Sequence, residues 1–251
     1  MHLRLKAPVR ACFGLGLAAT VLLSTGTPAV SATGQSAAQH SSTAASIRVA
    51  NDWRQTSVGY ADTHWNWTAW NDSTTVSNGS SQSNFECAEF VARSLAAAGL
   101  IPGLKSGDSQ DSYFYYNAPN GVQYDLLLIS DLDGYNSLYD FLMDFGLGTD
   151  LGNQPAKAQP GDVVVTFNSD SSNKLHTGLI VEAANGSSEP TVDAHNYARF
   201  HYGYHHYNAA GPAHVIRINA SATAGMQAAP QQHVADPNRI RSNFDPAPAL
   251  N

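Results

Sequence analysis

The sequence predicts a single α+β domain, with helices in its first half and a small antiparallel β-sheet in its second half. Three observations predict this class. Apolar residues recur at helical spacing in three segments before residue 149. After residue 158 the apolar residues lie in short runs bounded by turn residues, as they do in strands. Helices that precede the strands, instead of alternating with them, are typical of an α+β fold.

Three helices are expected in the first half of the chain. The first, within residues 48–67, places Trp53 and Tyr60 inward. The second, at residues 84–100, has apolar side chains three or four positions apart and ends at a glycine that a proline soon follows. The third, within residues 136–148, has Leu and Phe residues on one face and also stops at a glycine.

Four strands are expected in the second half. They occupy residues 159–168, 174–186, 189–207 and 213–220. A Pro-Gly-Asp turn precedes the first strand, and an Asn-Gly turn pair ends the second. Because short turns join antiparallel neighbours, the predicted sheet is antiparallel.

Both ends of the chain differ from the domain between them. Residues 1–32 have a positively charged start, an apolar stretch too short to cross a bilayer comfortably, and small residues that allow cleavage near Ala32. They predict a signal peptide and a secreted protein, with an uncleaved membrane anchor as the alternative. Residues 33–46 and 220–251 have little to bury and predict a disordered stem and a disordered tail. The domain is therefore placed at residues 47–219.

The charge of the chain limits its partners. The formal net charge is −7, and cleavage after Ala32 would remove three positive charges and no negative ones, leaving about −10. Such an acidic protein is poorly suited to bind nucleic acid or an anionic membrane surface. We therefore expect no nucleic-acid partner and, after cleavage, no membrane partner.

Histidines in the third predicted strand raise the question of a metal. His201 and His205 are four residues apart, which would align them on a helix, but Gly203 and the neighbouring tyrosines favour a strand or loop. No cysteine or acidic residue adjoins them, and structural zinc generally takes four ligands. The sequence therefore predicts no metal and no cofactor.

Cys87 would be the only cysteine after cleavage, because the other, Cys12, lies in the signal segment. Secreted domains usually pair their cysteines, so an unpaired one is an inert buried thiol, an intermolecular bridge or a reactive group. Cys87 falls in the first turn of the helix at 84–100, where free backbone N–H groups favour a thiolate and lower its pKa. It also shares the inward face with Phe90 and Val91, so a buried, unreactive side chain remains the alternative.

A cysteine nucleophile needs a base, and His176 in the second predicted strand is the candidate. A histidine in a strand can also be an ordinary core residue. A third polar group would have to orient the imidazole, and the following strand supplies Asp193, His195 and Asn196. Alternation places Asp193 and His195 on one face and Asn196 on the other unless the strand bulges, so the pattern does not choose among them.

The order of these motifs resembles the putative amidase domain, a bacterial branch of the papain-like, NlpC/P60 and CHAP superfamily. The stretch "NFECAEFVARSLAAAGL" is similar to that family's "DCTNFVSQAL", and "DSYFYYN" to its segment with "WYY". "QPGDVVVTF" and "LHTGLIVEA" are similar to "PGDIVFF" and "HVGIVTG", and "DAHNYARFHYGY" to its "HT..R" strand. The resemblance extends over roughly residues 58–218.

The resemblance implies a papain-like fold of the NlpC/P60 type, with N-terminal helices packed on a small antiparallel β-sheet. It makes Cys87 the nucleophile and His176 the general base. His195 falls where the amidase domain has its histidine, and Asn196 falls where CHAP-like proteins keep an Asn. We rank His195 slightly ahead of Asn196 as the group that orients the base, with Asp193 third.

The same resemblance raises two further points about the nucleophile. The backbone N–H of Cys87 would be one oxyanion donor, and the side chain of Asn84 or Gln82 a second. Glu86 and Glu89 stand where the family has Asp and Asn. A carboxylate at Glu89 would oppose a thiolate unless it points away, which puts substrate preference and retained activity in question.

We therefore predict a secreted, monomeric cysteine hydrolase that cleaves amide bonds in peptides of the cell wall, such as peptidoglycan stem peptides. Attack by the Cys87 thiolate would form an acyl-enzyme, which water hydrolyses with help from His176. Two alternatives remain open. One is a transglutaminase-like acyl transferase that uses an amine in place of water, and the other is a non-catalytic binding module on the same fold.

Overall fold

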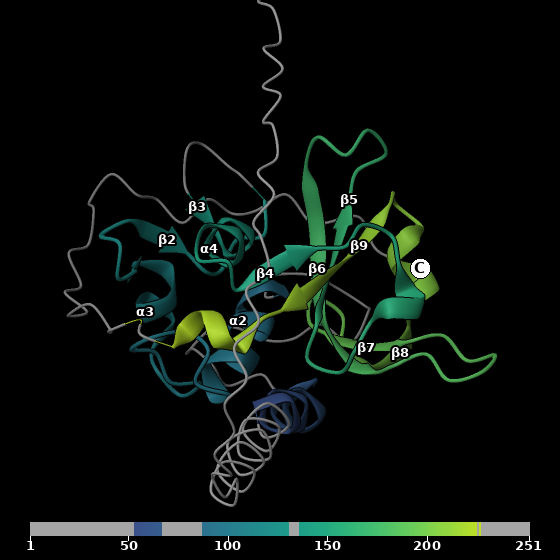
Figure 1. Ribbon diagram of the computed structural model, residues 1–251, viewed down its shortest axis with the longest axis horizontal. Helices are drawn as coiled ribbons and strands as arrows, with labels where there is room; N and C mark the ends of the chain where they lie inside the picture. The colour runs from purple at the N-terminus through teal and green to yellow at the C-terminus, as the bar shows by residue number, and fades with distance from the viewer. Residues whose placement is uncertain (1–52, 67–86, 131–135, 225, 227–251) are drawn as a thin grey trace, which may run out of the picture. The chain divides into compact units, whose positions relative to one another are not determined.

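A computed structural model describes residues 53–66, 87–130, 136–224 and 226 (Figure 1). The predicted signal peptide at 1–32, the stem at 33–46 and nearly all of the tail at 220–251 lie outside these residues. Near the end of the domain, Ala220–Thr223 form the short 3-10 helix η3, and Ala220 packs against the core, so ordered structure continues a few residues past 219. None of the helices within the described ranges has the length and apolar character needed to cross a membrane.

Helices form where the apolar periodicity predicts them. The helix at residues 53–64 buries Trp53, and Tyr60 packs against the same core, as predicted. The second predicted helix is α2 (Cys87–Ala97), and the third is α4 (Leu138–Asp144). A short helix that the periodicity does not reveal, α3 (Gln110–Phe114), lies between them.

Local side-chain chemistry sets the bounds of α4. The hydroxyl of Ser137 accepts a hydrogen bond from the backbone N–H of Asp140, and the carboxylate of Asp140 accepts one from the N–H of Ser137, which is a capping box. Gly146 follows the helix with φ +61°, a left-handed conformation that glycine adopts without strain. Phe141 and Leu142, on the inward face of α4, are fully buried.

The second half of the domain forms a six-stranded antiparallel sheet. Its spatial order is β4-β9-β5-β6-β7-β8, and all paired neighbours run antiparallel (Figure 1). The strands are β4 (Gly148–Asp150), β5 (Val163–Phe167), β6 (Lys174–Glu182), β7 (Thr191–Ala194), β8 (Arg199–Gly203) and β9 (Ala213–Ile218). Two short 3-10 helices, η1 (Pro155–Lys157) and η2 (Tyr204–Asn208), connect its strands.

One of the predicted strands is wrong, and one sheet has no counterpart in the prediction. Residues 189–207 do not form one strand, because the chain turns at Asn196, whose φ is +82°, and returns as β8 paired with β7. A second, three-stranded sheet was also not predicted. It has the order β1-β2-β3, with β1 (Tyr116–Asn117), β2 (Gln123–Asp125) and β3 (Asn136–Ser137), and β2 and β3 pair in parallel. Strands of two or three residues are too short to show an alternating pattern.

The main sheet separates two apolar cores. In β5, Val163 and Val165 face the core that contains Trp53, Phe90 and the other buried residues of α2. Val164 faces the opposite core, which η2 closes with Tyr204 and Tyr207. In β6, Leu179 and Val181 belong to the first core and Ile180 to the second, as alternation along a strand predicts.

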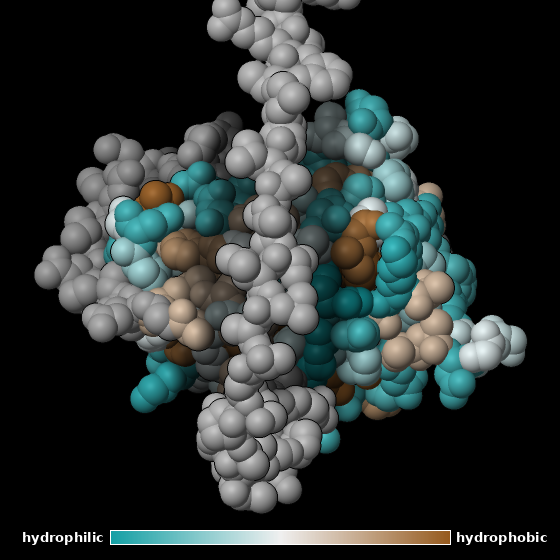
Figure 2. All heavy atoms as spheres, viewed as in Figure 1, coloured by the Kyte–Doolittle hydropathy of each residue, from teal (hydrophilic) through white to brown (hydrophobic). Residues whose placement is uncertain are grey.

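The outer surface is largely polar. On the face seen in Figure 2, hydrophilic side chains surround smaller apolar areas. Among the described residues, Val122 and Phe200 are the large apolar side chains that are exposed. Mixed helices and strands in two sheets make this an α+β fold, as the sequence predicts.

Candidate active site

Cys87 is the first residue of α2, where this helix packs against β6. The thiol is 7% exposed and belongs to the core beneath α2. The backbone N–H of Cys87 donates to Oδ1 of Asn196 at 3.1 Å. The backbone N–H of Thr177, in β6, points at the sulfur. Two elements far apart in the sequence therefore meet at the first turn of this helix.

Burial dominates the protonation of this thiol. It raises the pKa of Cys87 from 9.0 to about 11, although the N–H groups of Thr177, Ala88 and Cys87 and the side chain of Asn196 lower it. The prediction of a lowered pKa is wrong for this structure. Helix-terminal N–H groups do act on the sulfur, but the loss of hydration outweighs them. Cys87 is therefore a neutral thiol at pH 7.

Glu89 points away from the thiol into a buried polar network. Its carboxylate accepts hydrogen bonds from Nε of Arg93 at 2.9 Å and from Nε2 of Gln110 at 2.8 Å. Arg93 is itself buried and lies over the ring of Tyr113, with 4.5 Å between the guanidinium carbon and the ring centroid. The negative charge of Glu89 is therefore compensated by Arg93 and is not directed at Cys87.

His176 lies in β6, and the residue opposite it in β5 is Thr166. Its ring stacks on Tyr207, with 5.6 Å between centroids and 10° between planes. Burial, and then the positive charge of Arg199, lower the pKa of His176 to about 4, so the imidazole is neutral at pH 7. Nδ1 of His176 is buried and has no hydrogen-bond partner among the described residues.

The structure brings Cys87 next to the backbone of β6 at Thr177 but does not join its thiol to His176. The hydroxyl of Thr166 donates to the carbonyl of Tyr207, so Thr166 and His176 share the face of the sheet that η2 covers. Thr177 is on the other face, towards α2, because strand residues alternate. The imidazole of His176 therefore lies on the face of β6 that η2 covers, against Tyr207, whose phenol is close enough to Cys87 for the two groups to interact electrostatically.

The three candidates for the orienting group have separate partners. His195 contacts the carbonyl of His64 through Nε2 at 2.7 Å and stacks on Phe90, and burial lowers its pKa to about 4. Asp193 accepts a hydrogen bond from the N–H of His201 at 2.7 Å, and burial raises its pKa. Of the three, Asn196 has a hydrogen bond to Cys87, because its Oδ1 accepts the backbone N–H of Cys87. None of the three is hydrogen bonded to His176.

Some residues of this region have no signal in the sequence pattern. Thr177 contributes only its backbone, and Tyr207 comes from a histidine- and tyrosine-rich segment whose fold was not predictable. A side chain at Gly178 would meet Oη of Tyr207 at 3.0 Å and Cγ1 of Val192 at 2.6 Å, so glycine lets Tyr207 approach β6. The proposed oxyanion donors Gln82 and Asn84 lie outside the described residues.

Comparison with known families identifies the domain. Residues 51–216 match the family described as "putative amidase domain". Searches of curated proteins and of solved structures found no match. The matched range includes α2, the main sheet except for the last two residues of β9, and the candidate site residues Cys87, His176, Asp193, His195 and Asn196. The family description indicates amide-bond hydrolysis at a general level. The chain belongs to the family of the putative amidase domain.

Proposed function

We propose that this protein is a secreted, papain-like cysteine hydrolase that acts as a monomer on amide bonds in cell-wall peptides. Cys87 is the nucleophile, and His176 is the general base. One observation carries the proposal: in a domain of an amidase family, Cys87 starts a helix and its sulfur lies against the backbone of β6 at Thr177, the residue that follows His176. The signal-like residues 1–32 support export, and the resemblance to the putative amidase domain and the NlpC/P60 and CHAP superfamily supports the substrate class.

The reaction would start from neutral partners. At pH 7 the thiol of Cys87 keeps its proton and the imidazole of His176 carries none on its free nitrogen, because burial acts on both. His176 accepts the thiol proton at Nδ1 as the sulfur attacks the carbonyl carbon of the amide. The C–N bond then breaks, the departing amine takes the proton from His176, and an acyl thioester remains on Cys87. Water, deprotonated by His176, hydrolyses the thioester.

This mechanism requires a rearrangement when substrate binds. Cys87 and His176 are not hydrogen bonded in the resting structure, and catalytic pairs often tighten only in the substrate complex. The N–H of Cys87, the proposed oxyanion donor, is occupied by Asn196. A substrate carbonyl oxygen would displace the side chain of Asn196 and take this N–H, while the amide of Asn196 remains close enough to donate in its turn.

Turnover of defined substrates tests the proposal. Purified protein is incubated with peptidoglycan stem peptides, and released amines are measured by mass spectrometry. We expect Cys87→Ala to abolish release and His176→Ala to lower kcat by roughly 100-fold or more, the contribution typical of a general base. His214→Ala is the matched control, because His214 is also a strand histidine but hydrogen bonds to Asp150, and it should leave kcat unchanged.

The same assay separates the alternatives. A transglutaminase-like enzyme would attach an added primary amine, such as glycine amide, to the acyl group in preference to water. A binding module would retain the peptides in a pull-down without releasing any amine. Either result, or release that persists in Cys87→Ala, would overturn the proposed hydrolase.

A further inference from the structure

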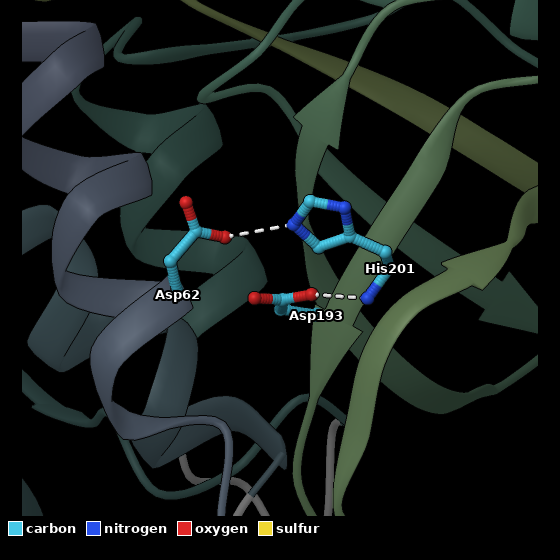
Figure 3. Close-up of side chains that lie close together, drawn as sticks. All are labelled: Asp62, Asp193 and His201. Carbon is cyan, nitrogen blue, oxygen red and sulfur yellow. Dashed lines mark hydrogen bonds and ion pairs between the residues drawn. The ribbon is translucent and has the colours of Figure 1, made fainter.

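We propose that Asp62, Asp193 and His201 form a binding site for a divalent transition-metal ion such as Zn²⁺. The three side chains come from the helix at 53–64, from β7 and from β8, and they converge on one point (Figure 3). Such an ion would tie the first described helix to the β7–β8 hairpin. The sequence alone predicts no metal, because Asp62 lies more than 130 residues from the other two.

The spacing of the donor atoms fits a small coordination shell. Nε2 of His201 and Oδ1 of Asp62 are 3.1 Å apart, and the donor atoms of all three residues lie within 4.8 Å of one another. Two ligands bound about 2.0–2.1 Å from a tetrahedral zinc ion are about 3.3 Å apart. One pair already has this spacing, and the widest pair has to close by at most about 1.5 Å.

A buried carboxylate oxygen independently indicates a ligand at this point. Asp193 is 0% exposed, and its Oδ1 accepts the N–H of His201 at 2.7 Å. Its Oδ2 has no hydrogen-bond donor among the described residues unless a proton is shared with the carboxylate of Asp62, and in Figure 3 this second oxygen is turned towards the side of Asp62. Buried carboxylate oxygens are rarely left unpaired, because their desolvation is unfavourable. A cation placed between the two aspartates would supply the partner.

The neighbouring residues also suit a metal-binding histidine. Oε1 of Glu182 lies 3.5 Å from Nδ1 of His201, while Oε2 of Glu182 accepts the hydroxyl of Thr191 at 2.8 Å. Histidines that bind metals through one ring nitrogen commonly donate the other N–H to a carboxylate, which fixes the tautomer. Glu182 is placed to do this, leaving Nε2 of His201 to face the ion.

The fold builds this geometry through a bulge in the hairpin. Val192 pairs with Tyr202 and Ala194 with Arg199, so β8 has one extra residue opposite Asp193. His201 adopts φ +48° there. Bulges redirect side chains, and here the N–H of His201 points towards Asp193 while its ring points towards Asp62 (Figure 3). Asp62 and His201 are 38% and 32% exposed, so an ion has access from solvent and can keep a water as a fourth ligand.

The competing interpretation is a hydrogen-bonded cluster that holds no ion, in which a proton is shared between the two carboxylates. Titration calorimetry with Zn²⁺ separates the two. The protein is purified without a polyhistidine tag, treated with a chelator and dialysed. We expect one Zn²⁺ per chain, a melting temperature that rises with Zn²⁺ until the site is saturated, and much weaker effects of Mg²⁺ and Ca²⁺, since imidazole favours transition metals.

Matched variants assign the binding to these residues. Asp193→Asn keeps an acceptor for the N–H of His201 but removes the charge, and we expect it to weaken Zn²⁺ binding by more than ~10-fold, the smallest loss typical of supporting residues. Glu189→Gln is the control, because Glu189 holds His205 in an exposed pair that could bind zinc adventitiously. It should leave the affinity unchanged.

If Asp193→Asn does not fold, the unmodified protein and the variant Asp62→Asn still test the proposal. Co²⁺ added to the unmodified protein should give the visible absorption of a low-symmetry, four- or five-coordinate site, and Zn²⁺ should abolish it. Asp62→Asn, a change at a half-buried side chain, should remove both effects. No saturable Zn²⁺ binding by the unmodified protein, or binding by Asp62→Asn and folded Asp193→Asn that is as tight as in the unmodified protein, would overturn the proposal.

Discussion

At the scale of single residues, the decisive feature is that Cys87 is a buried and neutral thiol. A position at a helix start suggests a thiolate, and the N–H groups there do lower the pKa of Cys87. Their effect is smaller than that of burial, so the resting protein is protected from oxidation and alkylation. If the protein is secreted as proposed, this protection would preserve an unpaired cysteine in an oxidising environment.

Alkylation measures this protection. Because a pKa of about 11 is two units above the ordinary value of 9.0, the thiolate fraction of Cys87 below pH 9 should be about 100-fold smaller than that of a free thiol. We expect iodoacetamide to label Cys87 at least that much more slowly than N-acetylcysteine at pH 7–8. Peptide mass spectrometry distinguishes Cys87 from Cys12. Labelling of Cys87 faster than the reference at pH 6–8 would instead indicate a stabilised thiolate.

Asn196 combines a backbone role and a side-chain role that mutations can separate. Asn196→Gly removes the hydrogen bond to the N–H of Cys87 and accepts the left-handed φ of +82°, so it should lower the free energy of unfolding by about 1 kcal/mol. Asn196→Ala should lower it by a further ~1 kcal/mol or more, because alanine is strained at this φ. Urea denaturation measures both, and equal losses would show that the backbone conformation is not strained.

At the scale of elements, α2 depends on a buried ion pair. Arg93 pairs with Glu89 one turn earlier, and both are about 1% exposed. Arg93→Met alone should lower the free energy of unfolding by roughly 3–5 kcal/mol, because it leaves a buried carboxylate uncompensated. The double variant Arg93→Met, Glu89→Leu should be clearly more stable than Arg93→Met. Additive losses in a urea double-mutant cycle would disprove this coupling.

Elements were predictable where they are long enough to show a period. Trp53, Tyr60 and Phe141 fall on the buried faces that the helical spacing assigns to them. The hairpin of β7 and β8 was missed, because its turn at Asn196 contains neither glycine nor proline. The strand β4 was missed because three residues at an edge have no recognisable pattern.

The candidate site was predictable only in part, because its geometry depends on strand register and burial, which no short stretch of sequence shows. Sequence order singles out Cys87, His176, His195 and Asn196, and the fold does place Asn196 at Cys87. Which face of β6 the side chain of His176 occupies depends on its exact register with Thr166, and no local signal fixes that register. The degree of burial of a thiol is likewise a property of the assembled core.

At the scale of the whole molecule, buried neutral histidines make the fold sensitive to acid. The pKa values of His176 and His195 are about 4 in the folded state, below the ordinary 6.5, so the unfolded chain binds more protons between these values. Stability should therefore be full above pH 6.5 and fall as the pH drops towards 4, by at most about 3 kcal/mol for each histidine. The raised pKa of Asp193 acts in the opposite direction and offsets part of this loss.

Denaturation with urea at several pH values between 7 and 4 checks this. The comparison of the wild type with His176→Gln isolates one histidine, because glutamine fills a similar space and does not titrate. The variant should lose less stability on acidification than the wild type does. Parallel stability curves for the two proteins would mean that His176 is solvated or already charged.

The proposed mechanism passes through a thioester at Cys87, so trapping this intermediate tests the mechanism most directly. The protein is mixed with a stem peptide, quenched in acid within the first turnover, and digested for peptide mass spectrometry. We expect the peptide that contains Cys87 to gain the mass of the acyl fragment, and we expect Cys87→Ala to show neither the adduct nor turnover. Amide cleavage without an adduct on Cys87, or with an adduct on another residue, would contradict the assignment of Cys87 as the nucleophile.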